Sequence, residues 1–246
     1  MPDDKVALVT GSSSGIGAGI ARRLAGDGWR VVVNSRASSA GAGAALAAEL
    51  PGAGYVPADV ADEQESARLV ETVLERFGRL DVLVNNAGRT VPIPHPDLTA
   101  ATPAIWREIF DLNVIGTWQT TVAAMPALRK SGAGCVVNIS SIAGSRPAGS
   151  SIPYAVSKAA VEHMTRLLAR VAGPEVRVNA VAPGLVETPW VTGSDFFTPI
   201  AEQVSAIAPL RRVGQPADVA DAVAALIGAS YTTGQVLLVD GGVHLA

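Results

Sequence analysis

A tyrosine and a lysine at helical spacing are the residues of this sequence best placed to move a proton. Tyr154 and Lys158 stand four residues apart, so on a helix their side chains share one face. Pro153, directly before them, suits the first turn of a helix because its missing N–H would be unpaired there anyway. An ammonium held beside a phenol stabilises the phenolate and lowers its pKa. The pair therefore predicts a tyrosine that donates and accepts a proton near neutral pH.

Two hydroxyls precede this pair at the end of a predicted strand. The β-branched run 136–139 is typical of a buried strand, and Ser140 and Ser141 follow where its carboxyl end would meet solvent. A Gly/Ser/Pro-rich loop then leads to the predicted helix. Acid–base chemistry by these residues needs a substrate and a cofactor, and the binding sites for both have to come from the rest of the chain.

A glycine-rich turn lies between the first predicted strand and the first predicted helix. The apolar run 5–10 is followed by glycines at 11, 15 and 17, and the helical pattern continues to about residue 25. Such a turn presents backbone N–H groups and a positive dipole end to a phosphate. The pattern G-x-x-x-G-x-G differs from the common dinucleotide-binding fingerprint, so an ordinary glycine-rich turn is the alternative for this stretch alone.

The end of the second predicted strand, 29–34, is where a dinucleotide-binding fold contacts the adenosine ribose. It reads Asn34-Ser35-Arg36 and lacks the carboxylate that would accept the 2′-OH of NAD. The Arg36 guanidinium can pair with a phosphate, which predicts a preference for NADP(H); a solvated loop arginine is the alternative. Asp59 follows the third predicted strand and could bond the adenine amino group, whereas Asp62 fits better as the cap of the next helix.

Predicted strands and helices alternate along the whole chain. Apart from the runs already named, the predicted strands are 54–57, 80–84, 177–181 and 235–239, and the predicted helices are 39–50, 63–77, 103–130, 153–172 and 216–227. This alternation predicts an α/β fold with a parallel sheet covered by helices on both faces.

Two stretches depart from the regular alternation. Asn113 stands inside the predicted helix 103–130, where its amide would compete with backbone bonding, so it has either a local function or a packed structural role. Residues 185–213 form an insertion that contains Trp190, Phe196 and Phe197. We expect a mobile lid that excludes water from a substrate, and a pair of surface helices is the alternative.

Composition excludes several classes of protein. With 246 residues, 48% apolar and 17% charged, the chain has ample length for a folded core. The net charge of −3 and the absence of a basic run disfavour nucleic acid and anionic membranes as partners. The start MPDDKVALVT lacks a signal-peptide core, which predicts a cytoplasmic protein. Cys135 is the single cysteine, and the three histidines lack zinc-site spacing, so we expect no disulfide and no metal.

Taken together, the motifs identify a family. The segments TGSSSGIG at 10–17, NNAG at 85–88 and YAVSK at 154–158, with Asn113 and Ser141 between them, resemble the short-chain dehydrogenase/reductase family from Lys5 to about Gly242. Ser141 rather than Ser140 matches the family's serine-to-tyrosine spacing. The resemblance implies one domain over 1–246 with a Rossmann-type, doubly wound, parallel seven-stranded sheet, helices on both faces and three layers.

The resemblance also implies a mechanism, which is hydride transfer between a nicotinamide and a carbonyl or secondary alcohol. Tyr154 would supply the proton, and Ser141 would hydrogen-bond the same substrate oxygen. Lys158 would hold the ribose hydroxyls and lower the Tyr154 pKa, while Asn113 would anchor a water in a proton relay. An epimerase or dehydratase of the extended branch is an alternative, disfavoured because no carboxyl-terminal substrate domain follows the last predicted strand. A cofactor-binding member without turnover is another.

The remaining site residues are implied by the same resemblance. The cofactor-binding set is Gly11, Ser13, Ser14, Gly15, Ile16, Gly17, Asn34, Ser35, Arg36, Asp59, Val60, Asn86, Ala87, Gly88, Tyr154, Lys158, Pro183, Gly184, Val186 and Thr188. The substrate-binding set is Ser141, Pro147, Pro153, Trp190 and Phe197. Many NADP-preferring members carry a basic residue where this chain has Ser14, so the NADP prediction depends on Arg36. The substrate is expected to be a ketone or alcohol of moderate size, as in 3-oxoacyl-carrier-protein reductase-like members, and the assembly a homotetramer or homodimer.

Overall fold

The computed structural model describes residues 5–245, so positions 1–4 and 246 of the predicted domain lie outside the described residues. Seven parallel strands form one sheet, as predicted, and their order is β3-β2-β1-β4-β5-β6-β7. The strands are β1 Val6–Val9, β2 Arg30–Ser35, β3 Gly54–Pro57, β4 Val82–Asn85, β5 Gly134–Ile139, β6 Val176–Pro183 and β7 Val236–Val239.

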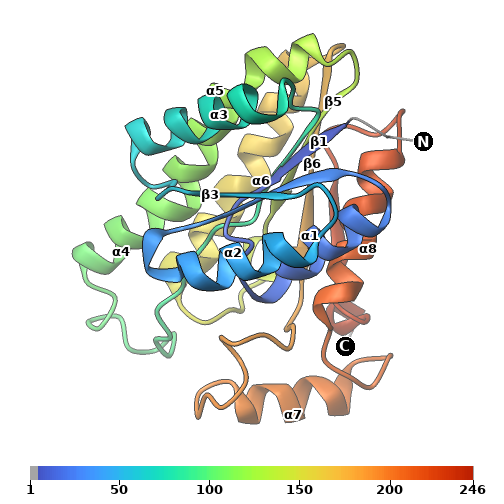
Figure 1. Ribbon diagram of the computed structural model, residues 1–246. Coiled ribbons are helices and arrows are strands. Elements are labelled where there is room, and N and C mark those ends of the chain that lie inside the picture. Colours follow the sequence, from blue (N-terminus) through green and yellow to red (C-terminus); the bar gives the residue numbers. More distant parts are fainter. Residues whose placement is uncertain (1–4, 246) are drawn as a thin grey trace.

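Helices cover both faces of the sheet and make three layers (Figure 1). On one face lie α1 Gly15–Gly26, α2 Ala40–Glu49 and α8 Pro216–Gly228, whose apolar side chains share a core cluster with the sheet. On the other face α3 Glu63–Phe77, α5 Thr117–Lys130 and α6 Ile152–Ala172 share a second cluster. Because the central strands are buried on both sides, they read as continuous apolar runs in the sequence.

The strand order reverses direction at β1, which pairs with β2 on one side and with β4 on the other. In open parallel sheets, the crevice outside the carboxyl ends of the strands at such a point is where ligands bind. The glycine-rich turn follows β1 and the NNAG segment begins at the end of β4, so the topology brings both motifs to this crevice.

The predicted helix 103–130 is in fact three consecutive helical pieces. α4 Pro103–Phe110 is followed by a π-helical turn, Asp111–Gly116, which leads into α5. Thr102 caps α4 through the Ile105 N–H, and Gly116 lies where an added Cβ would come 2.9 Å from the Val60 carbonyl oxygen. A π-turn inside a helix often marks a functional position, and this one contains Asn113.

The insertion 185–213 contains one helix, α7 Thr198–Ile207, rather than a helix pair. In Figure 1, α7 lies below the body of the molecule, beyond the end of β6 from which the segment departs. Within residues 5–245, no helix combines the length and apolar character needed to cross a membrane.

Candidate active site

The glycine-rich turn is built to receive an anion. Gly11 and Gly15 have φ values of +61° and +56°, and a Cβ at Gly11 would lie 2.7 Å from the Ala87 Cα. Ser14 precedes α1 without a side-chain cap bond, and no acidic residue lies in the first turn of that helix. The first N–H groups of α1 are therefore available to a phosphate, and the residues here fit a dinucleotide.

Thr10, the first residue of the motif at 10–17 and one for which no separate role was predicted, joins this turn to the NNAG segment. Its Oγ1 accepts hydrogen bonds from the backbone N–H groups of Asn86 at 3.0 Å and Ala87 at 3.1 Å. The Asn86 amide in turn donates to the carbonyl oxygens of Thr10 at 2.9 Å and Gly11 at 3.0 Å. The Asn86 side chain thus shapes the crevice by holding two strand ends together. A threonine at a strand end was the signal that could have indicated this role.

Two of the three residues predicted at the ribose position are committed to bonds within the protein. Asn34 is 1% exposed; its Nδ2 donates to the Val56 and Ala58 carbonyl oxygens at 3.1 and 3.3 Å, and its Oδ1 accepts from the Gly11 N–H at 3.3 Å. Ser35 is also buried, and its Oγ lies 3.2 Å from the Tyr55 hydroxyl. Arg36 is exposed, and no residue among 5–245 is recorded as a partner of its guanidinium.

The other cofactor-site predictions lie around the same crevice. Asp59 accepts the Ala61 N–H at 3.0 Å while Asp62 caps α3 through the Glu65 N–H at 2.8 Å, so the predicted assignment of the cap to Asp62 is confirmed. Val60 is buried in the α3–α5 side of the core. These contacts leave the second Asp59 carboxylate oxygen for an adenine amino group.

The segment after β6 crosses over the glycine-rich turn. Gly184 donates its N–H to the Val239 carbonyl at 2.9 Å, just after Pro183 ends β6, and Val186 is buried. A Cβ added at Gly15 would lie 3.4 Å from the Thr188 Cγ2. Thr188 is therefore next to the turn although 173 positions separate the two residues (188 − 15).

Ser141, Tyr154 and Lys158 meet where β5, β4 and α6 converge. Tyr154 is hydrogen-bonded to the Ser141 hydroxyl, and the Lys158 Nζ lies 5.7 Å from the centre of the tyrosine ring. The Nζ donates to the Ile139 carbonyl at 2.8 Å. A Cβ added at Gly88 would lie 3.3 Å from the Asn113 Oδ1 and 3.6 Å from the Lys158 Nζ, so the four predicted catalytic residues surround one spot.

The expected lowering of the Tyr154 pKa is wrong for this structure. Burial raises the pKa of the phenol, and the hydrogen bond with Ser141 opposes that rise only in part. Burial also lowers the pKa of Lys158 to about 8. No carboxylate is among the groups that influence this pKa, so nothing opposes the effect of burial. The ammonium donates to the Ile139 carbonyl and is not among the groups that shift the Tyr154 pKa. Because burial raises that pKa above its ordinary value, the phenol keeps its proton at neutral pH.

Asn113 uses its whole amide on neighbouring groups. The Oδ1 accepts from the Arg89 N–H at 2.8 Å, and the Nδ2 donates to the Arg89 carbonyl and to the Ser157 Oγ, both at 3.0 Å. Ser157 in turn donates to the Tyr154 carbonyl at 2.7 Å. The asparagine therefore ties the segment after β4 to the catalytic helix, and its anchoring of a water stays a prediction. Ser157 was not singled out from the sequence, although it lies between Tyr154 and Lys158.

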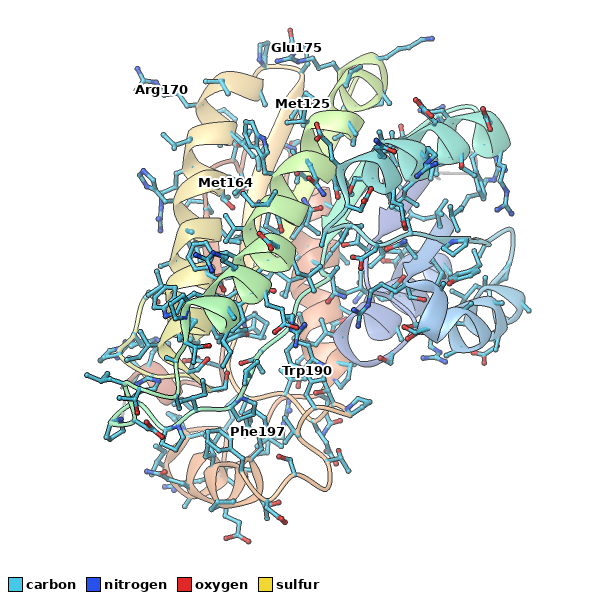
Figure 2. All side chains as sticks on the ribbon, turned by 90° about the vertical axis from the view of Figure 1, so that its left-hand side faces the viewer. Met125, Met164, Arg170, Glu175, Trp190 and Phe197 are labelled. Atoms are coloured by element: carbon cyan, nitrogen blue, oxygen red, sulfur yellow. The ribbon has the colours of Figure 1, made fainter. Side chains whose placement is uncertain are left out.

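The predicted substrate residues differ in their surroundings. Phe197 is 9% exposed and packs edge-on against Phe196 with ring centres 5.0 Å apart, whereas Trp190 is 50% exposed. Figure 2 shows Trp190 and Phe197 at one end of the molecule, far from Arg170 and Glu175 at the other. Pro153 is buried at the start of α6, and Pro147 is exposed in the preceding loop, where no recorded contact brings it to the catalytic cluster.

Buried polar atoms without a partner gather in the two loops beside the cluster. Within residues 5–245 these are the Arg89 Nε, the His95 Nε2 and the Ser151 Oγ. The two loops are joined by a hydrogen bond from the Ile93 N–H to the Ser150 carbonyl at 2.8 Å. None of the three was predicted, because their lack of partners follows from the packing of loops that are far apart in sequence.

Comparison with known proteins decides the family. A family model described as enoyl-(acyl carrier protein) reductase matches residues 11–244. A Streptomyces violaceoruber protein named as ketoacyl reductase 2 of the granaticin polyketide synthase is 68% identical over 244 residues, which cover 99% of this chain and 98% of that protein. The chain belongs to the short-chain dehydrogenase/reductase family.

Two further proteins are similar to this chain over nearly their whole length. The 3-oxoacyl-[acyl-carrier-protein] reductase of a Synechocystis strain is 38% identical over 245 residues, covering 97% of this chain and 96% of that one. The solved structure of ElxO with NADP bound superposes with a TM-score of 0.90 at 29% identity, covering 99% of this chain and 100% of that one. This short-chain dehydrogenase/reductase is accordingly an oxidoreductase that uses a nicotinamide cofactor.

Proposed function

We propose that this enzyme reduces a 3-oxoacyl-type ketone with NADPH, and that Tyr154 delivers the proton. The observation that carries the proposal is the hydrogen bond between Tyr154 and Ser141, with Lys158 beside the ring. The relative that is 68% identical bears the name of a ketoacyl reductase, which supports this substrate class.

The mechanism assigns each step at the substrate oxygen to this chain's own residues. The bound nicotinamide supplies the hydride. Ser141 and Tyr154 donate hydrogen bonds to the carbonyl oxygen as negative charge develops on it, which stabilises the transition state more than the ground state. Tyr154 then gives its phenolic proton to that oxygen.

The raised pKa of Tyr154 suits the reductive direction. A phenol that stays protonated at neutral pH is ready to act as the acid, whereas the oxidative direction would need the phenolate. Lys158, with its pKa lowered to about 8, donates one hydrogen bond to Ile139 and has two further N–H groups for ribose hydroxyls. Asn113 holds the segment that follows β4 against α6, which fixes the position of Gly88 beside the Lys158 Nζ.

The NADP preference depends on Arg36. The amide of Asn34 is bonded within the protein and Ser35 is buried, so the exposed guanidinium is the cationic group at the end of β2 that a 2′-phosphate could pair with. The NADP-bound neighbour supports the same choice.

We further propose that two copies of the chain associate through α5 and α6. These helices lie side by side on one face of the molecule (Figure 2). Between them lies a groove of about 300 Å³, whose lining includes the exposed Val122 and Val171. The two helices and the π-turn before α5 expose four further apolar side chains: Ile115, Trp118, Val156 and Leu167. An apolar face of this kind on a monomer marks an interaction surface, and a symmetric partner would present the same face.

The proposed function is tested by following NADPH oxidation with purified protein. A 3-oxoacyl thioester of coenzyme A, a small cyclic ketone and an aldose serve as alternative substrates. We expect turnover with the thioester, and a higher kcat/KM for it than for the other two. Turnover confined to the aldose, or no NADPH oxidation with any carbonyl compound, would contradict the proposal.

A further inference from the structure

Ser140 lies next to the catalytic candidate Ser141 and has bonds of its own. It is 2% exposed, and its N–H donates to the Val181 carbonyl at 2.7 Å. Its Oγ lies 3.2 Å from the Lys158 carbonyl oxygen and 3.2 Å from the Glu162 Oε1. Ser140 therefore fixes the end of β5 to β6 on one side and to α6 on the other.

Glu162 is a buried carboxyl group one helical turn beyond Lys158. It is 4% exposed, and its other recorded partner is the Arg166 guanidinium at 3.7 Å, whose side chain is 52% exposed. Burial raises its pKa, and the Ser140 hydrogen bond and the Arg166 charge oppose that rise. Removing a carboxyl group from water costs free energy. The burial of Glu162 therefore calls for a role other than stabilising the fold.

The same carboxyl group also lies against the turn that follows Ser141. A Cβ added at Gly144 would come 2.6 Å from the Glu162 Oε1 and 3.0 Å from the Ala159 nitrogen. The 3₁₀ turn Ile142–Gly144 is thus packed directly on α6, and it is linked to Ser141, whose Oγ accepts the Ala143 N–H at 3.2 Å. Glu162 touches the chain both before and after Ser141.

We propose that Glu162, acting through Ser140, is a positioning residue for Ser141. The carboxyl group and the Ser140 hydroxyl hold segment 140–144 on α6, the helix that also carries Tyr154. That arrangement keeps the Ser141 hydroxyl at hydrogen-bond distance from the phenol. The proposal rests on the proposed function, because it assigns Glu162 a role in the same reaction. Displacing a reacting group by about 1 Å can reduce the rate by about 100-fold, so a side chain that fixes Ser141 without touching substrate can control kcat.

The test compares three variants of the full-length enzyme. Glu162→Gln keeps the length and the acceptor oxygen toward Ser140, Glu162→Leu removes the acceptor at similar volume, and Arg166→Leu removes only the exposed partner. We expect Glu162→Leu to lower kcat about tenfold or more, with the KM for ketone and the Kd for NADPH unchanged within error. Glu162→Gln should restore kcat, and Arg166→Leu should leave it unchanged.

A second readout needs no turnover. Hydrogen–deuterium exchange of the peptide that spans 140–146 should be faster in Glu162→Leu and unchanged in the other two variants. If the wild type reduces no carbonyl compound, the proposed function is refuted. Faster exchange in Glu162→Leu would even then support the positioning of segment 140–144 by Glu162. Unchanged exchange, an unchanged kcat per folded molecule in Glu162→Leu, or an equal loss in Glu162→Gln would each overturn the positioning role.

Discussion

Replacement of Gly17 by alanine tests whether the crevice between β1 and β4 holds the cofactor. A Cβ at this position would lie 2.5 Å from the Asn86 Nδ2, 2.6 Å from the Gly11 carbonyl oxygen and 2.7 Å from the Ser12 Cα. Two of these atoms belong to the backbone of the turn, so the turn itself has to move. We expect the variant to be less stable and to bind cofactor weakly.

Gly26 in the same helix provides a matched control. No atom lies within 4 Å of a Cβ added there, so alanine adds helix propensity without a clash. Gly26→Ala should stabilise the protein by about 1 kcal/mol. For Gly17→Ala, overpacking of about 3 kcal/mol minus the same propensity gain leaves a loss of about 2 kcal/mol.

Thermal unfolding with and without NADPH measures both effects. At about 2–4 °C per kcal/mol, Gly17→Ala should melt about 4–8 °C below the wild type and Gly26→Ala about 2–4 °C above it. A cofactor concentration of about 100 Kd stabilises a folded protein by about 2.7 kcal/mol, which gives the wild type a clear upward shift. Gly26→Ala should keep that shift and Gly17→Ala should lose most of it. If Gly17→Ala keeps the wild-type melting temperature and the full NADPH shift, the close approach deduced for this turn is wrong.

Three further predictions concern cofactor choice, pH and assembly. Arg36→Asp should reverse the preference from NADPH to NADH in the ratio of kcat/KM values; an unchanged ratio would make Arg36 a bystander. Lys158 has its pKa lowered from 10.5 to about 8 by burial, so between these values the unfolded chain holds a proton that the folded protein has lost. Unfolding free energy measured against pH should therefore rise across that window in the wild type relative to Lys158→Met, and parallel curves would exclude the lowered pKa. Val171→Asp, on the exposed face of α6, should reduce the mass measured by light scattering to that of a smaller assembly, whereas Asp at exposed Tyr231 should not; equal masses would contradict association through α5 and α6.

The order and type of the elements follow from local sequence. The third strand was predicted at 54–57 and lies at Gly54–Pro57, and the predicted helix 63–77 is α3. β-branched runs and capping residues act over a few positions, so their patterns are readable without a structure. The parallel order of the sheet follows in turn, since helices separate successive strands.

Features that depend on distant parts of the chain were not predictable. The π-turn at 111–116 is fixed by tertiary contacts, with Gly116 against the Val60 carbonyl and Asn113 bonded to the Arg89 backbone. The direction of the Tyr154 pKa shift depends on burial and on where the Lys158 ammonium points. The sequence shows that position 34 carries an amide rather than a carboxylate. It does not show that this amide donates hydrogen bonds to the carbonyl oxygens of Val56 and Ala58.

Ser140 illustrates the same limit within the site. The spacing to Tyr154 distinguished Ser141 from its neighbour, which left Ser140 without a role. The structure gives Ser140 bonds to Val181, Lys158 and Glu162, on two elements that come later in the chain. Only the folded chain relates these residues to Ser141.

The central claim is that Tyr154 supplies the proton, and Tyr154→Phe tests it most directly. The substitution removes one hydroxyl and keeps the ring. We predict that kcat for ketone reduction falls about 10²–10⁴-fold, the contribution typical of a general acid, while NADPH affinity from fluorescence titration and the melting temperature stay close to the wild type. A Tyr154→Phe enzyme that binds NADPH normally and reduces the ketone at the wild-type rate would contradict the account.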